Sequence, residues 1–367
     1  MTTYRTLVPL NLRSSPRIAQ NVSRTLPKGT RVISLQQRHI ANNYEWLLVL
    51  LEDYTVGWVA LRSEFLQAES AAAVRNTFGL HYYPYGADPS ALLDAAGQGL
   101  LQMVTVVNDV DVAERALAKG VPYVVLRVGV SENEPVPPIS GTQADYQIGW
   151  DWFFSERLWQ PVQHANPRLI LQLHNESNFN ENLPAFDNFF TLGCIAAADS
   201  VGRRLAVFND AVGNPHMWYE DGRYHSTTWL KRTDALRACL YTASGSRRAV
   251  GQQHFVSYHA YSRPGAHRAS ELTAREWYAG RFEGLYSVVP QFQPPLLLTE
   301  YGSYDASVPA MGGYAAVAQD VKDSMLWLQN VPNVVAFAYW TIGQWQDSAI
   351  DNGLPLILST VRSVLQV

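Results

Sequence analysis

Eight apolar segments recur between residues 78 and 340, and stretches of helical periodicity separate them. Segments that are apolar on both faces and alternate with helices are typical of a parallel sheet covered by helices. The predicted strands are 78–83, 101–107, 123–128, 169–174, 205–209, 254–259, 295–300 and 334–340. The predicted helices are 88–97, 110–119, 143–165, 185–201, 226–243, 273–288, 313–330 and 355–365. Eight such units in about 290 residues match the size of a (β/α)8 barrel.

The alternative α/β architecture is an open, doubly wound sheet. Such sheets usually have fewer strands, and no glycine-rich G-x-G-x-x-G loop follows the first predicted strand. We therefore expect residues 78–367 to form one (β/α)8 domain.

Composition excludes several classes of protein. The chain is 47% hydrophobic, 12% aromatic and 16% charged, which argues against disorder. Its net charge of −4 argues against a nucleic-acid partner, and no apolar run is long enough to span a membrane. Two cysteines cannot make a disulfide framework. Residues 1–5 contain no apolar segment of the signal-peptide type, so secretion or wall association would require a leader that has been removed.

The first 67 residues differ in character from the rest of the chain. They contain short alternating segments separated by turn residues and no useful helical periodicity. The predicted strands are 22–25, 30–36, 45–51, 55–60 and 65–66. Closely spaced short strands close best as a small all-β barrel. Residues 68–77 are an alanine-rich linker between this domain and the (β/α)8 domain.

Within the small domain, the order and spacing of four elements resemble a bacterial SH3 domain. These are residues 10–16, residues 26–30, Trp46 and the Thr-Val-Gly-Trp-Val segment 55–59. The family usually has glycine where this chain has Ser15. The resemblance implies a binding or targeting module, often directed at cell walls. A structural cap on the larger domain is the alternative interpretation.

Reactive groups of such barrels lie at the carboxyl ends of the strands. Glu176 follows the fourth predicted strand and Glu300 ends the seventh, so both are expected at one mouth. Glycoside hydrolysis needs a pair of carboxyl groups facing one cleft, one protonated and one ionised. The alternative is that both are structural, each tied to an arginine.

The pair and its surroundings resemble clan A of the retaining glycoside hydrolases. Asn175-Glu176 is similar to the clan's Asn-Glu pair on strand four, and Glu300 in Thr-Glu-Tyr-Gly is similar to its nucleophile on strand seven. The resemblance implies that Glu176 is the acid/base, that Glu300 attacks the anomeric carbon, and that Asn175 binds the sugar 2-hydroxyl. A retaining mechanism places the two carboxyl groups about 5–5.5 Å apart.

Four more residues extend the resemblance. His259 and Tyr261 match the His-x-Tyr element of strand six, and Trp340 matches the strand-eight tryptophan under the cleaved sugar. The resemblance implies that Tyr261 hydrogen-bonds the nucleophile and that His259 lines the site. Arg127 resembles the arginine that keeps the nucleophile ionised, although some of the clan's families carry it on strand two and not on strand three.

Other side chains at the strand ends are candidates for substrate binding because sugars stack on rings and bind polar groups. We expect His81, Asn209, Trp218 and Tyr301 among them; Trp218 lies in a long loop, at 209–226, of the kind that is usually functional. No spacing of histidines or cysteines supports zinc, so we expect no metal and no organic cofactor.

The carboxyl pair and the resemblance to clan A together imply a retaining β-glycoside hydrolase acting on a poly- or oligosaccharide. Two alternatives stay open. One is a carbohydrate- or cell-wall-binding protein without catalysis, and the other is a glycosidase directed at peptidoglycan. Residues 1–70 carry 8 basic and 5 acidic groups, a balance that would suit an anionic wall polymer.

Overall fold

The computed structural model divides the chain into two compact units, Met1–Val74 and Arg75–Val367, and each is described separately. The structure describes residues 3–51, 55–68, 74–84, 88–128, 140, 142–175, 184–211, 215–221, 223–262, 268–270, 279–303, 308–331, 333–343 and 349–366. Glu176 lies outside these residues. No helix in the described residues has the length and apolar character needed to cross a membrane.

The first unit is a seven-stranded antiparallel sheet with the order β3-β2-β6-β5-β4-β1-β7. Its strands are β1 (Thr3–Thr6), β2 (Leu10–Arg13), β3 (Val22–Leu26), β4 (Arg31–Ala41), β5 (Tyr44–Leu50), β6 (Val56–Ala60) and β7 (Leu66–Ala68). The expected all-β architecture is present. However, β3 and β7 end the strand order without pairing to each other in the described residues, so the sheet is not closed by hydrogen bonds.

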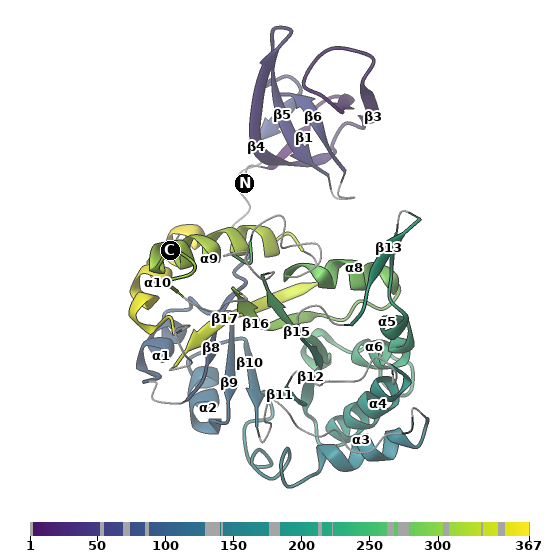
Figure 1. Ribbon diagram of the computed structural model, residues 1–367, viewed down its shortest axis with the longest axis vertical. Helices are drawn as coiled ribbons and strands as arrows, with labels where there is room; N and C mark the ends of the chain where they lie inside the picture. Colours follow the sequence, from purple (N-terminus) through teal and green to yellow (C-terminus); the bar gives the residue numbers. More distant parts are fainter. Residues whose placement is uncertain are drawn as a thin grey trace. The chain divides into compact units, whose positions relative to one another are not determined.

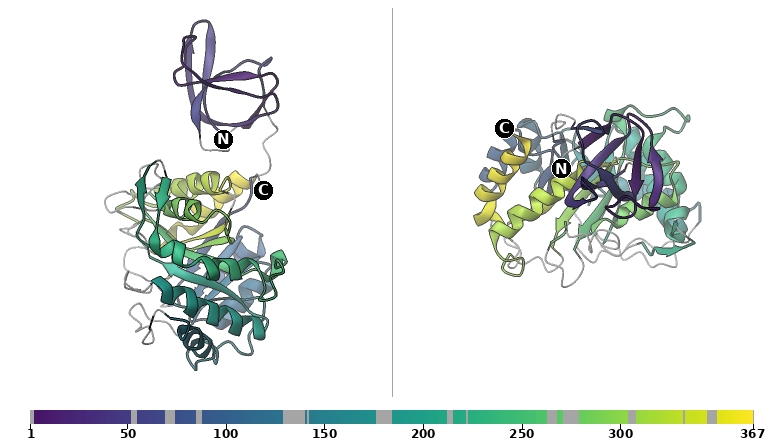
Figure 2. Two further views of the ribbon diagram at one scale, coloured as in Figure 1. Left: turned by 90° about the vertical axis from the view of Figure 1, so that its right-hand side faces the viewer. Right: turned by 90° about the horizontal axis from the view of Figure 1, so that it is seen from above.

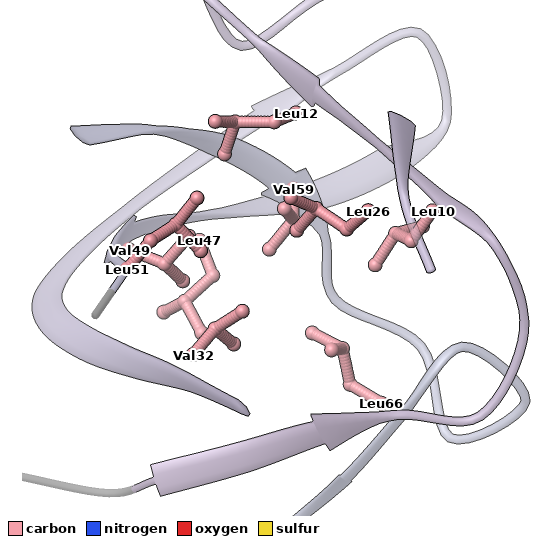
Figure 3. Close-up of a cluster of buried hydrophobic side chains, with 9 residues drawn as sticks. All are labelled: Leu10, Leu12, Leu26, Val32, Leu47, Val49, Leu51, Val59 and Leu66. Carbon is pink, nitrogen blue, oxygen red and sulfur yellow. The ribbon is translucent and has the colours of Figure 1, made fainter. Parts of the chain in front are cut away.

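An aliphatic core lies against one side of this sheet (Figure 3). Its members are Leu10, Leu12, Leu26, Val32, Leu47, Val49, Leu51, Val59 and Leu66. Every strand from β2 to β7 contributes to or adjoins this core, because alternate side chains of each strand face one side of the sheet. Strands β1 and β2 were absent from the prediction, since four residues carry too little alternation to be distinguished from a turn.

The second unit is built on eight parallel strands that close into a barrel in the order β8-β9-β10-β11-β12-β15-β16-β17. They are β8 (Phe78–Tyr82), β9 (Met103–Val107), β10 (Tyr123–Arg127), β11 (Ile170–Gln172), β12 (Arg204–Asp210), β15 (Phe255–Tyr261), β16 (Leu296–Gly302) and β17 (Val334–Ile342). All eight predicted strands are present, and closure of β17 onto β8 rules out an open sheet.

Helices surround the outside of this barrel (Figures 1 and 2). They are α1 (Ser90–Gly97), α2 (Val110–Ala118), α3 (Asp145–Phe153), α4 (Pro184–Ser200), α5 (Thr227–Lys231), α6 (Thr233–Leu240), α8 (Arg281–Val288), α9 (Tyr314–Leu328) and α10 (Leu354–Leu365), with the 3-10 turns η1 (Val250–Gln252) and η4 (Asp351–Gly353). The helix predicted at 226–243 is broken at Arg232, and that predicted at 143–165 ends at Phe153.

The loop after β12 also differs from the prediction, because it contains a hairpin. Strands β13 (Trp218–Glu220) and β14 (Arg223–His225) pair antiparallel, and the hairpin extends beyond the barrel strands in Figure 1. Three residues per strand are too few to produce a recognisable alternation in the sequence.

One layer of the barrel interior is apolar. It consists of Met103, Val125, Ile170, Ala206, Phe255, Leu297, Ala336 and Ala338. Towards the carboxyl ends of the strands the buried side chains become polar, with His81, Arg127 and Glu300 among them. The barrel therefore has an apolar base that fixes its geometry and a polar end at which chemistry is possible.

Helices α3 and α4 pack with close backbone contact at Gly149 and Gly193. A Cβ added at Gly193 would lie 2.0 Å from the Tyr146 carbonyl oxygen. We therefore expect Gly193→Ala to lower the free energy of unfolding by about 1–3 kcal/mol, measured by urea denaturation. Gly97→Ala is the control, because the nearest atom there is 3.4 Å away in the flexible Lys119 side chain. Equal losses from both variants would contradict the close-packing explanation.

Candidate active site

The Glu300 side chain lies at the polar end of the barrel and is only 5% exposed. Its Oε1 accepts a hydrogen bond from Arg127 Nη1 at 2.7 Å, and its Oε2 accepts one from the Tyr261 hydroxyl at 2.5 Å. The three residues come from β16, β10 and β15. Both oxygens of the carboxylate are thus held by donors on two other strands, which fixes its orientation.

Arg127 connects Glu300 to the end of the fourth barrel strand. The same Nη1 atom also donates to Asn175 Oδ1. Asn175 immediately precedes Glu176, which lies outside the described residues. The Glu176–Glu300 separation therefore stays a prediction. Arg127 lies on the third barrel strand, and the closed barrel brings it into direct contact with a carboxylate 173 residues further along the chain.

Two imidazoles lie near the same carboxylate. His259 Nδ1 is 3.4 Å from Glu300 Oε2, and His81 Nε2 is 3.8 Å from Glu300 Oε1. The His81 ring packs against the Trp340 ring with 4.3 Å between centroids, and the Tyr261 ring meets Trp340 edge-on at 6.4 Å. The half-buried Trp340 thus supplies an aromatic surface next to the carboxylate.

The surroundings of Glu300 keep it ionised. Burial by itself would raise the pKa of its carboxyl, but His259, Arg127 and His81 nearby and the Tyr261 hydrogen bond lower that pKa to about 2. Burial also lowers the pKa of His81 to about 3. At neutral pH the site therefore holds a carboxylate beside a neutral His81 ring, with Arg127 as the permanent cation.

A local irregularity in the barrel aims Glu300 at the mouth. Leu297 faces the barrel interior, and the Thr299 hydroxyl bonds to Ser257 at 2.6 Å. Strict alternation would then turn Glu300 outward. The pairing of β15 with β16 shifts after Tyr258, however, so that His259 pairs with Glu300. Such bulges re-aim side chains next to functional sites.

Tyr301 does not line the site, which corrects the prediction for this residue. It is fully buried, and its hydroxyl shares a hydrogen bond of 2.8 Å with Ser324 on α9. Its ring lies 4.9 Å from that of Phe337. Tyr301 follows Glu300 directly, so it faces the opposite side of the strand and packs between the barrel and α9.

The remaining predicted residues lie after β12. Asn209 is fully buried near the end of that strand. Trp218 lies on the β13–β14 hairpin, where its ring stacks on His225 at 5.4 Å and 14°. Because the hairpin follows the carboxyl end of β12, it belongs to the same end of the barrel as Glu300, but Trp218 is not part of the Arg127–Glu300 contact group.

Three residues that support this site are not among the predicted catalytic or substrate-binding residues, although the sequence already indicates His174 as a hydrogen-bonded residue of the site wall. Thr341 Oγ1 lies 3.0 Å from His81 Nδ1. His174 Nδ1 lies 2.8 Å from the Asn175 carbonyl oxygen, and burial lowers the pKa of His174 to about 4. Arg232 makes two hydrogen bonds to Asp210. Thr341 and His174 adjoin predicted residues in sequence, which is a usable indication, whereas Arg232 falls inside a predicted helix.

No family model matches the chain, and no curated protein matches its sequence. Solved structures of GH5 and GH30 glycoside hydrolases align with this chain over most of its length at low sequence identity. ZgEngAGH5_4 in complex with a cellotriose is 11% identical, with a TM-score of 0.48 over 81% of this chain and 99% of that one. A GH5-4 broad specificity endoglucanase from Ruminococcus flavefaciens is 10% identical, with a TM-score of 0.42 over 82% and 100%. A GH30 endoxylanase from Clostridium papyrosolvens C71 is 14% identical, with a TM-score of 0.39 over 80% and 72%.

Proposed function

We propose that the protein is a retaining glycoside hydrolase that cleaves β-glycosidic bonds of an oligo- or polysaccharide. The observation that carries this proposal is the state of Glu300, a buried carboxylate that is ionised and oriented at the mouth of the barrel. A nucleophile must be unprotonated and fixed against the carbon it attacks. Arg127 and Tyr261 supply the charge and the hydrogen bonds that support an unprotonated and oriented Glu300.

In the first step a Glu300 oxygen bonds to the anomeric carbon as the glycosidic C–O bond breaks. Glu176 transfers its proton to the leaving oxygen, so the product is a neutral alcohol and a covalent glycosyl-enzyme ester. In the second step Glu176 takes a proton from water, whose oxygen attacks the same carbon and displaces Glu300. Two inversions leave the sugar with its original configuration.

Arg127 and Tyr261 have separate roles in this reaction. The Arg127 cation stabilises the Glu300 carboxylate electrostatically and, through Asn175, links it to the segment that contains Glu176. The Tyr261 hydroxyl donates to Oε2, and that bond must weaken as the carboxylate becomes an ester. Trp340 offers a ring face on which the C–H groups of a pyranose can stack.

The test of this function is a hydrolysis screen followed by proton NMR of the first product formed. Cellotriose, xylotriose, mannotriose and purified peptidoglycan form the panel, the last because residues 1–67 resemble a wall-targeting module. Release of the β-anomer before mutarotation is the expected result. Initial release of the α-anomer would contradict the retaining mechanism. Binding without turnover would favour the alternative of a non-catalytic carbohydrate- or wall-binding protein.

Arg127→Met should move the acid limb of the kcat/KM profile to higher pH. Because Arg127 lowers the pKa of Glu300, its loss raises that pKa, and the nucleophile is then protonated at pH values where the wild type keeps it ionised. The loss of one adjacent cation corresponds to about one to three pH units. Because the wild-type limb lies near pH 2, the expected result is that an acid limb absent from the wild type appears when kcat/KM is measured between pH 3 and 9.

The control for this profile is Lys322→Met, which removes an exposed cation from α9. We expect its profile to match the wild type. If Arg127→Met lowers the rate equally at every pH and leaves the acid limb in place, then the arginine does not act through the ionisation of Glu300.

A further inference from the structure

The Asn209 side chain is buried without the hydrogen bonds that a buried amide needs. Its exposed fraction is 0%, and neither Oδ1 nor Nδ2 has a partner among the residues that the structure describes. Leaving a buried donor or acceptor unpaired is unfavourable, and most buried amides in proteins are paired. An unpaired amide at the carboxyl end of a barrel strand therefore calls for a ligand that pairs with it.

The backbone around Asn209 is unusual as well. Phe208 has a φ of 76° and Asn209 a φ of 48°, both in the left-handed region. Asparagine tolerates this conformation, whereas a bulky phenylalanine rarely adopts it. The pairing with β15 passes from Phe208–Ser257 to Asp210–Tyr258, so Asn209 is the extra residue of a bulge. Strained backbone and bulges concentrate at functional sites.

The two residues that flank Asn209 are held by one arginine. The Arg232 guanidinium donates to both oxygens of Asp210, at 2.5 and 2.8 Å, and its carbon lies 4.4 Å from the centre of the Phe208 ring. The Phe208 ring also meets that of Trp229 on α5, at 5.9 Å, on the outside of the barrel. Strict alternation from Ala206, which faces the barrel interior, would turn Asn209 outward, but the left-handed backbone at Phe208 and Asn209 breaks that alternation. With Phe208 packed against α5, Asn209 is the residue left to face the barrel interior.

We propose that Asn209 contacts the substrate and that its amide binds hydroxyl groups of an uncharged sugar ring in the mouth of the barrel. This inference rests on the function proposed above. A carboxamide offers an acceptor oxygen and a two-proton donor nitrogen, which complement neighbouring hydroxyls that each donate and accept. An uncharged ring fits better than a uronic acid, because Arg127 is already bonded to Glu300 and Asn175 and Arg232 is bonded to Asp210.

The decisive variant is Asn209→Gly, because glycine accepts the left-handed backbone while the unpaired amide is removed. We expect kcat/KM for the trisaccharide that the wild type cleaves fastest to fall about ten- to a hundredfold. The melting temperature should stay unchanged or rise. Asn209→Ala is the second variant; it also lacks the amide and should show the same loss of kcat/KM.

The matched control is Asn188→Ala, which removes a buried asparagine whose amide is paired. Asn188 Nδ2 donates to Asp234 at 3.2 Å, and its Oδ1 accepts from the Ala235 backbone at 2.9 Å. Its loss should lower the melting temperature and leave kcat/KM of the folded enzyme unchanged. The two asparagines therefore give opposite patterns if Asn209 serves the substrate and Asn188 serves the fold.

Two results with the Asn209→Gly enzyme would overturn the proposal. One is an Asn209→Gly enzyme with wild-type kcat/KM, which would mean that the amide pairs only with internal water. The other is a loss of activity that merely follows a loss of folded protein. Calorimetric titration of cellotriose, xylotriose and mannotriose tests the Asn209 contact separately from the proposed hydrolase activity. If the wild type binds a trisaccharide without cleaving it, hydrolysis is refuted, and weaker binding by Asn209→Gly still supports the contact. A wild type that binds none of the three overturns the contact as well.

Discussion

Glu300→Gln should give a folded protein whose rate of glycoside hydrolysis is about 10⁴-fold or more below that of the wild type. Glutamine keeps the shape of the side chain, and its amide oxygen can still accept from Arg127, but it cannot form the glycosyl ester. Losses of this order follow the removal of a catalytic group in well-characterised hydrolases. The measurement is the initial rate with the best trisaccharide of the panel, with circular dichroism to check folding.

The matched control is Glu156→Gln, which alters an exposed carboxyl in the segment after α3 and should leave the rate unchanged. A Glu300→Gln enzyme that retains more than about a tenth of the wild-type rate would contradict the nucleophile assignment, because that loss is far too small for a missing nucleophile.

A structural role for Glu300 can be separated from a nucleophilic one by adding azide to Glu300→Ala. With an activated aryl β-glycoside, azide can occupy the space left by the carboxylate, and its nitrogen can attack the anomeric carbon. The aryloxide leaves, and one inversion gives an α-glycosyl azide. Formation of this product is the expected result, whereas a structural carboxylate would show no rescue.

Arg232→Met should be among the most destabilising single changes in the barrel. Arg232 and Asp210 are 2% and 6% exposed, so the variant leaves a buried carboxylate without its cation. Breaking a buried ion pair in this way costs about 3–5 kcal/mol. The measurement is the free energy of unfolding from urea denaturation, taken for the barrel transition alone because the two units need not unfold together.

The double variant Arg232→Met/Asp210→Leu should recover most of this stability, because it leaves no buried charge behind. Arg115→Met is the exposed control: its Asp111 partner lies on the surface of α2, and such pairs contribute about 0–1 kcal/mol. If Arg232→Met and Arg115→Met lose the same stability, the Arg232–Asp210 pair does not stabilise the barrel.

Most of the barrel could be predicted from the sequence because its strands are buried on both faces. Such strands appear as continuous apolar runs, and the helices between them have a different period. The errors fall where tertiary contacts override local preference. The helix predicted at 226–243 is broken at Arg232, whose side chain is bonded to Asp210, and the β13–β14 hairpin is too short to leave a pattern.

The candidate site was only partly predictable for a related reason. Strand order places Arg127, Tyr261 and Glu300 at one end of the barrel, and the structure brings all three into contact. The sequence could not show which side of its strand each residue faces. Tyr301 was expected in the mouth and lies against α9, because a bulge assigns the inward position to its neighbour Glu300.

The sequence by itself therefore determined the two-part organisation of the chain, the eight-stranded barrel and the residues at its strand ends, because burial and periodicity are local properties of a chain. Only the tertiary structure decided which of those residues meet and in what charge state. The pKa of Glu300 depends on Arg127, His81 and His259, which come from three other strands, and Asn209 is aimed by a bulge that Arg232 supports from outside the barrel. Both effects require the closed barrel, since they arise from distances and backbone geometry that exist only once the strands are assembled.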